Sequence, residues 1–475
     1  MKIIRFLLIL ACSCNGASAA LAQTTAIVGG SVIDGTGAPP QPNAIILIDG
    51  KKIVAIGKQG AINVPAGAKV IDASGKYIIP GLIDTNIHLF LTPAIDQAWL
   101  GKYEGRFEEI AAEAAQLALK SGLTTVFDSW GPLQPLLNAR DGIRRGELVG
   151  SRLYVAGNIV GLSGPLGRDF QSGIQQATVS PAFAKRINKI WEENVGPDLL
   201  DKTPEEVRTE IRKYIGRGVD FIKFAESSHN LQAAKNNWLM FSPDAAKAIV
   251  EEGHKAGITV QTHTSNIESL RLAVLAGIDM AQHPAILGER EMPDSLVRLL
   301  VDRGVYCGVL SKTKKRIEIE KEGWRDTGGK GTSRSPEALD HWQGNIVKLI
   351  RAGARITLAT DQGPDDPKFS YSVSPRLRED EPTRMGEGQF LWLESIVEKG
   401  MSPMDAIVAA TRNGAAAYHH LSEFGTLEGG KYADLLVLDA NPLENISNAR
   451  KISLVMKEGA VIDRDRLPEK KILTQ

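Results

Sequence analysis

Metal-binding residue types stand at the ends of short apolar segments throughout the middle of this 475-residue chain. We predict that eight of these segments are β-strands, with amphipathic helical segments such as 104–120, 204–214, 244–255 and 336–352 between them. The predicted strands are 81–88, 123–129, 153–160, 219–225, 258–263, 279–283, 305–310 and 355–361. Strands that alternate with helices pair in parallel, and eight such units in about 330 residues are typical of a (β/α)8 barrel. The sequence therefore predicts an α/β fold built on a TIM barrel.

Both ends of the chain carry a different pattern. Residues 25–80 contain short β-type runs separated by turn residues, and the C-terminal region repeats this in 434–438, 452–456 and 460–462. Neither end can bury much apolar surface alone. We therefore predict that 23–80 and 424–475 complete one small β-sandwich, while 81–423 forms the barrel.

The first 22 residues predict a secretory signal peptide. Two basic residues precede an apolar run over 6–11, and small residues then lead to Ala22. We expect cleavage near Ala22 and an exported protein, periplasmic or secreted, with lipoprotein processing at Cys12 as the alternative. No later uncharged apolar stretch reaches the roughly 18 residues of a membrane span, so no stable membrane insertion is expected.

Charge and cysteine content narrow the function further. Basic and acidic residues balance at 56 each, so nothing in the overall charge attracts nucleic acid or an anionic membrane, and a small-molecule substrate fits better. Only Cys307 follows the signal segment, which leaves no disulfide to predict. Because Cys307 lies in an apolar segment, we predict a buried structural thiol.

Five polar residues close, or nearly close, a predicted strand: His88, Lys223, His263, His283 and Asp361. The carboxyl ends of barrel strands converge in space and form the active site in this fold. Histidine and carboxylate are suitable ligands for a divalent transition metal, and a carboxylate can also take a proton from water. Singly, each histidine could be an interior hydrogen-bonded residue and Asp361 a helix cap, but their joint placement favours a metal site.

Lys223 lies among apolar residues, where an ammonium group is unfavourable. One chemical solution is a carbamate formed with carbon dioxide, which turns the amine into a carboxylate able to bridge two metals. The alternatives are a lysine that reaches solvent and one that forms a structural ion pair.

Other residues remain open. His229 could meet substrate from a loop or be solvated, and Trp130 could line an apolar pocket or pack under a loop. Residues 312–335 are predicted to be a mobile, solvated lid. Four further histidines are predicted to be surface or structural residues: His254, His341, His419 and His420.

Several motifs resemble the amidohydrolase superfamily, particularly its imidazolonepropionase-like and prolidase-like branch. The match covers nearly the whole chain after the signal segment. It includes IPGLID at 79–84, GLTTV at 122–126, GVDFIK at 218–223, GIDMAQH at 277–283, TD at 360–361, MSPMDAIVAAT at 401–411 and GTLEGGKYADLLVL at 425–438.

The resemblance implies one or two divalent ions, zinc foremost, with cobalt, manganese or iron as alternatives. It implies that carboxylated Lys223 bridges two metals and that His263 and His283 bind one of them. The other metal would be bound by Asn86 and His88, at the end of the first strand, together with Asp361. The implied reaction is hydrolysis of a C–N bond in a small amide, urea, carbamate or peptide-like substrate. Alternatives are a lactone or ester hydrolase, a lyase or isomerase on the same centre, and a binding protein with a decayed site. A homo-oligomer is also implied.

The sequence departs from the superfamily at one ligand. Most members carry His-x-His after the first strand's Asp, whereas this chain has Asn86 and His88. An amide oxygen is a weaker donor than imidazole for a borderline metal, so this metal position is weakened, emptied or tuned to another ion. The Asn-x-His pair resembles the phenylurea and thiocarbamate hydrolase subgroup.

Overall fold

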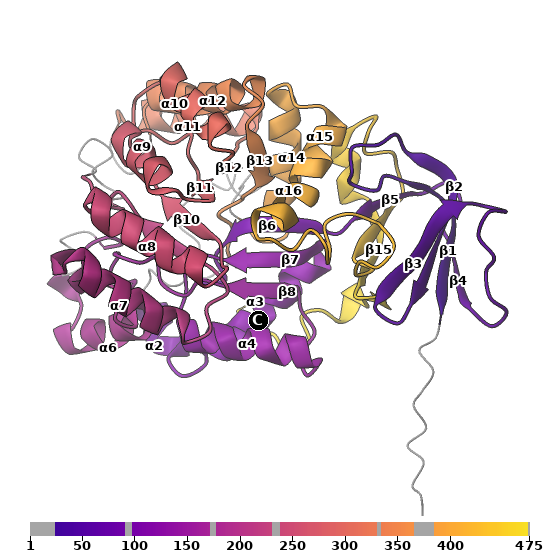
Figure 1. The fold of residues 1–475 in the computed structure, drawn as a ribbon, viewed down its shortest axis with the longest axis horizontal. Helices are drawn as coiled ribbons and strands as arrows, with labels where there is room; N and C mark the ends of the chain where they lie inside the picture. Colours follow the sequence, from indigo (N-terminus) through magenta and orange to yellow (C-terminus); the bar gives the residue numbers. More distant parts are fainter. Residues whose placement is uncertain are drawn as a thin grey trace, which may run out of the picture.

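The computed structural model describes residues 24–90, 97–171, 177–229, 238–329, 334–364 and 384–473 (Figure 1). The predicted signal peptide, with Ala22 and Cys12, lies outside the described residues. Eight strands of the central region overlap the eight predicted ones. They are β6 (Leu82–Ile87), β7 (Leu123–Asp128), β8 (Arg152–Val155), β9 (Ile222–Ala225), β10 (Val260–His263), β11 (Met280–Gln282), β12 (Tyr306–Val309) and β13 (Arg355–Leu358).

These strands form two parallel sheets that meet at both edges. One sheet has the order β6-β7-β8 and the other β13-β12-β11-β10-β9. Past the end of β8, Val160 forms a parallel bridge to Phe224 of β9. At the other edge, the Asp361 N–H donates to the Asn86 carbonyl at 2.8 Å, and the His88 N–H donates to the Gln362 carbonyl at 2.9 Å. The two sheets thereby close into a barrel.

Helices surround the strands on the outside (Figure 1). Several begin at a Ser or Thr cap followed by proline; Thr203, for example, forms a capping box with Glu206. The predicted helix 104–120 begins later, at Phe107, because the chain turns at Gly105 with φ of 84°. The helices are α2 (Gln97–Tyr103), α3 (Phe107–Lys120), α4 (Leu133–Arg145), α6 (Pro181–Glu192), α7 (Pro204–Ile215), α8 (Pro243–Lys255), α9 (Ile267–Ala276), α10 (Asp294–Asp302), α11 (Lys314–Asp326), α12 (Pro336–Arg351), α14 (Gly388–Glu398), α15 (Pro403–Ala409) and α16 (Arg412–Ala417), with short 3-10 turns η1 (Pro197–Asp201), η2 (Ile446–Arg450) and η3 (Arg464–Arg466).

Strands from both chain ends share a second sheet. Its order is β16-β15-β14-β5-β1-β2-β3, and β4 also pairs with β1. The antiparallel pair β5–β14 joins the two ends of the chain, and Ile27, Ile78 and Leu435 are buried in the core of this domain. The strands are β1 (Thr25–Val32), β2 (Gln41–Asp49), β3 (Lys52–Lys58), β4 (Lys69–Asp72), β5 (Tyr77–Pro80), β14 (Leu435–Leu438), β15 (Ile452–Lys457) and β16 (Ala460–Val461). All eight strands belong to one hydrogen-bonded sheet.

The segment after β12 differs from its prediction as a mobile, solvated lid. Residues Lys314–Asp326 form α11, which Thr313 caps by accepting from the Arg316 N–H. Ile317 and Ile319 of this helix are buried. The prediction was wrong for this part, because a helix with a side-chain cap and buried apolar residues forms despite the high charge of the segment. Residues 330–333 lie outside the described residues.

Among the residues that the structure describes, no helix is long and apolar enough to cross a membrane.

Candidate active site at the carboxyl ends of the barrel strands

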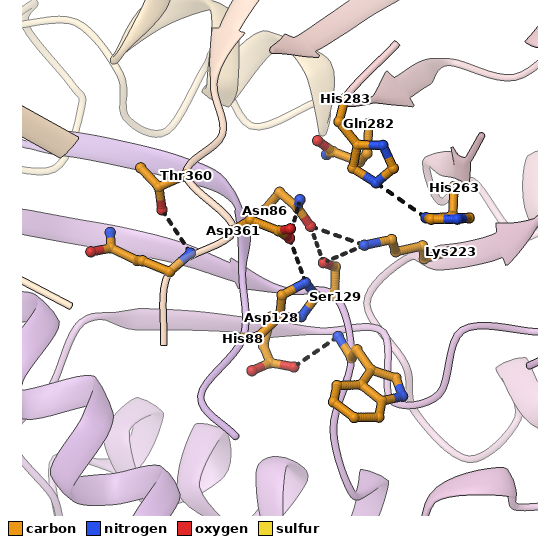
Figure 2. A network of polar contacts seen from close by, with 12 residues as sticks. Asn86, His88, Asp128, Ser129, Lys223, His263, Gln282, His283, Thr360 and Asp361 are labelled. Atoms are coloured by element: carbon orange, nitrogen blue, oxygen red, sulfur yellow. Dashed lines mark hydrogen bonds and ion pairs between the residues drawn. The ribbon is translucent and has the colours of Figure 1, made fainter. Parts of the chain in front are cut away.

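The structure brings the six predicted ligand residues together at one end of the barrel (Figure 2). Each lies on its strand or just beyond its carboxyl end, and all but Asp361, whose side chain is 27% exposed, are almost fully buried. They are Asn86 and His88 from β6, Lys223 from β9, His263 from β10, His283 after β11 and Asp361 after β13.

Two of these residues have an unusual backbone. His283 and Asp361 have positive φ, at 39° and 59°, a region that residues other than glycine rarely occupy. The His283 N–H donates to the Gly308 carbonyl at 2.7 Å, and the Asp361 N–H is bonded to β6, so the barrel itself holds both conformations. Strained residues of this kind cluster at functional sites, which supports a role for this barrel end.

His263 and His283 face each other. Nδ1 of His263 lies 3.2 Å from Nε2 of His283. Burial lowers the pKa of both rings, to about 3 for His283, so both are neutral and keep a lone pair. Two ligands on one tetrahedral zinc ion lie about 3.3 Å apart, given bonds of about 2.0–2.1 Å. The separation of the facing nitrogens therefore fits a shared divalent ion.

Lys223 extends into the space between the histidine pair and β6 (Figure 2). Its Nζ donates to Asn86 Oδ1 at 3.0 Å and to Ser129 Oγ at 3.1 Å. Burial lowers the pKa of Lys223 to about 8, against the opposing effect of Asp361 and Asp128. The fraction of neutral amine near neutral pH is therefore larger than for an exposed lysine. Ser129 could not be singled out from the sequence, because a serine after an apolar strand is common.

Asp361 accepts two hydrogen bonds through Oδ1. His88 Nε2 donates at 2.8 Å and Asn86 Nδ2 at 2.9 Å. Burial alone would raise the pKa of Asp361, but the bond from His88 and the positive charge of Lys223 hold it well below its usual range. His88 is itself neutral because burial lowers its pKa. Asp361 is therefore an ionised carboxylate held in place by β6.

Two buried carboxyl groups that sequence reasoning did not single out support the strand ends. Asp84 accepts from the Thr360 hydroxyl and from Gln362 Nε2 at 3.0 Å, and burial raises its pKa to about 6. Asp128 accepts from the backbone N–H groups of Leu89 and Trp130, and burial raises its pKa to about 8. These bonds tie β6 to β13 and to β7.

The two candidate substrate residues line the same region. Trp130 is buried and stacks on Phe170, with ring centroids 4.3 Å apart. Phe170 in turn lies 4.9 Å from His229, whose ring is 5.1 Å from that of His263. His229 Nδ1 lies 3.2 Å from the Asp169 carbonyl. An aromatic wall therefore borders the metal-ligand candidates, and Phe170 is its unpredicted member.

Few of the side chains in this donor set are ordinary metal ligands placed as a group. Among the described residues, no three His, Cys, Asp or Glu side chains form a group that could hold a metal ion. His263 and His283 supply two donors at a suitable separation, and Lys223 becomes a third only as a carboxylate. Three buried ring nitrogens, His88 Nδ1, His263 Nε2 and His283 Nδ1, have no hydrogen-bond partner in the described structure. The residues fit a divalent ion when Lys223 is carboxylated.

The remaining candidates lie elsewhere. His254 on α8 is partly exposed and lies 3.0 Å from Asp279. A cavity of about 670 Å³ lies at the opposite end of the barrel, against the β-domain, and His419 and His420 line it. Charged residues of that cavity pair across it, as Arg152 of β8 does with Glu458 of the β-domain, so the cavity lies between two domains. Burial raises the pKa of the Cys307 thiol to about 12, as expected of an inert structural thiol.

Comparison with known proteins agrees with this architecture. Residues 77–462 match the model of the amidohydrolase family. The structure is similar to those of a molinate hydrolase (TM-score 0.89, 34% identity, 95% of this chain and 97% of the other) and of phenylurea hydrolase B (TM-score 0.89, 35% identity, 95% and 100%). The sequence is 27% identical to ochratoxinase of Aspergillus niger over 90% of this chain and 83% of that protein. The chain, with its barrel and β-domain, belongs to the amidohydrolase family.

Proposed function

We propose that this amidohydrolase uses a divalent metal ion to hydrolyse a C–N bond in a small amide, urea, carbamate or peptide-like substrate. The observation that carries the proposal is the placement of the facing His263 and His283 nitrogens near Lys223, with an ionised Asp361 across the site. The names of the relatives, among them a phenylurea hydrolase and an ochratoxinase, support hydrolysis of small molecules.

Amidohydrolases generally use divalent metal ions, and we propose zinc here, with cobalt, manganese or iron as alternatives. His263, His283 and carboxylated Lys223 would hold the ion. A divalent ion at this position polarises a substrate carbonyl and lowers the pKa of water. Burial of Lys223 supports carboxylation, because a neutral amine is the form that adds to carbon dioxide.

Asp361 is the proposed proton carrier. Its low pKa keeps it ionised, so it can accept a proton from the attacking water and pass it to the leaving nitrogen. The bonds from His88 and Asn86 fix its Oδ1 and leave Oδ2 for this transfer. Trp130, Phe170 and His229 would hold an apolar or planar group of the substrate against the site.

We also propose that the chain is exported after cleavage near Ala22 and that it assembles as a homo-oligomer. The basic and apolar pattern of the first 22 residues supports export, with processing at Cys12 as the alternative. The resemblance to enzymes that often assemble supports the oligomer.

A substrate panel tests the proposed reaction. The chain from residue 23 onward would be loaded with zinc and incubated with aryl amides, phenylureas, carbamates, lactones and proline dipeptides in water enriched in heavy oxygen. We expect turnover of a C–N substrate, loss of turnover after chelation, and label in the acid or carbamate fragment. Turnover of lactones alone would favour the ester alternative, and turnover without label would refute hydrolysis.

A further inference from the structure

A positively charged group without an acidic partner lies beyond the end of β12. Trp342 of α12 donates its indole N–H to the Leu310 carbonyl at 2.9 Å, which fixes the indole at the carboxyl end of β12. Two cations lie over this ring. Lys312 Nζ is 4.8 Å from its centroid, and the Arg334 guanidinium carbon is 5.4 Å from it. Both are therefore at the same end of the barrel as the proposed catalytic residues.

The nearby acid is already occupied. Glu320 of α11 accepts from Lys312 Nζ at 2.6 and 2.8 Å and from Arg316 Nε at 2.6 Å. Arg334 has no hydrogen bond or ion pair within the described part of the chain, only its contact with Trp342. Burial lowers the pKa of Arg334, and the more distant Glu320 offsets this only in part. Arg334 is partly buried, and a guanidinium that is partly withdrawn from water without an acid of its own is unfavourable until an anion reaches it.

Arg334 also lies beside the strands that carry the proposed active site. It lies over Trp342, whose indole is bonded at the carboxyl end of β12. β12 pairs with β11, which precedes His283, and with β13, which precedes Asp361. Among the described residues, Lys312, Arg316 and Arg334 lie around Glu320 here, although basic and acidic residues balance over the whole chain.

We infer that Arg334 is a positioning residue that binds a carboxylate carried by the substrate at the mouth of the active site. This inference rests on the proposed C–N hydrolysis and narrows its substrates to amides or ureas that bear an acid group. A guanidinium presents two parallel N–H donors that match the two oxygens of a carboxylate. One uncompensated positive charge suits a monoanion better than a dianionic phosphate, which would draw on further donors.

Matched substrate pairs test the inference. N-acyl amino acids and their neutral C-terminal amides, such as N-benzoylglycine and N-benzoylglycinamide, share the scissile bond and differ in the anion. In the zinc-loaded protein we expect kcat/KM at least tenfold higher for the acid of the best pair. In Arg334→Gln the preference for the acid should be lost, mainly through a higher KM for the acid. The kcat/KM for the neutral amide should stay within about twofold of the wild-type value. Arg334→Lys should restore part of it.

Arg298→Gln is the matched control, because Arg298 is exposed on the outer helix α10. Equal loss for acid and amide in Arg334→Gln would mean a structural role and overturn the inference. The absence of any preference for the acid across the pairs would also overturn the inference. Tryptophan fluorescence titration with the same compounds reads binding without turnover. Acid-selective binding lost in Arg334→Gln would support the carboxylate site even if hydrolysis itself were absent, in which case only the proposed function fails.

Discussion

The two halves of the site satisfy their polar atoms in different ways. In the aspartate half (Asn86, His88 and Asp361) the residues hydrogen-bond to one another, because Asn86 and His88 both donate to Asp361 Oδ1. In the histidine half (Lys223, His263 and His283) the facing ring nitrogens contact each other at 3.2 Å, and the lysine is almost fully buried. Two facing imidazoles at this separation can share one ion, whereas Oδ1 of Asp361 is already occupied by two donors. We therefore expect the tightly held ion in the histidine half.

The largest expected effect comes from removing Lys223. Lys223→Ala should lose the metal and lower kcat/KM at least a thousandfold, because several kcal/mol of electrostatic stabilisation disappear with the ion. Elemental analysis and the substrate assay measure both. Added bicarbonate should assist metal uptake by the wild-type apoprotein. Lys185→Ala, on the exposed face of α6, is the control. Full activity in Lys223→Ala would refute its place in the ligand set.

Asp361→Asn separates the two halves most directly. We expect kcat to fall by roughly 10² to 10⁴, the range for losing a positioned proton acceptor. The metal count should stay near that of the wild type, because the histidine half holds the ion. Metal loss as complete as in Lys223→Ala would instead show that the aspartate half contributes equally to binding.

A smaller effect is expected at Ser129, which touches both halves. Its hydroxyl receives a bond from Lys223 and donates to Asn86 Oδ1. Ser129→Ala should weaken metal affinity by about 10- to 100-fold, as for other residues that orient a ligand. Competition with a chelator measures this, and Ser295→Ala on the exposed side of α10 is the control. Unchanged affinity would contradict a role for Ser129 in orienting Lys223.

The smallest change in rate is expected at Asn86. Elemental analysis of the wild type should find nearer one tightly held ion per chain than two. Asn86→His adds an imidazole donor to the aspartate half and should raise the count, while the rate changes by less than about tenfold because the first ion is already in place. A wild-type count firmly at two would contradict the asymmetry between the halves.

Prediction from sequence succeeded where the pattern is local and repeated. All eight barrel strands overlap their predicted segments, because a buried strand needs a short apolar run whatever surrounds it. It failed for residues 314–326, where many charges hid a helix with two buried isoleucines. It also missed Phe170 and Arg334, since an aromatic or basic residue in a connecting segment has no periodicity to mark it.

The sequence by itself determined the residue types at the strand ends, and the barrel makes such ends converge whatever their separation along the chain. It also determined the substitution of Asn86 for a histidine. Only the tertiary structure decided how these groups are paired: Asn86 and His88 with Asp361, Lys223 with Asn86 and Ser129, and His263 with His283. Hydrogen bonding and pKa depend on distances of a few ångströms and on burial, which arise only when the sheets close.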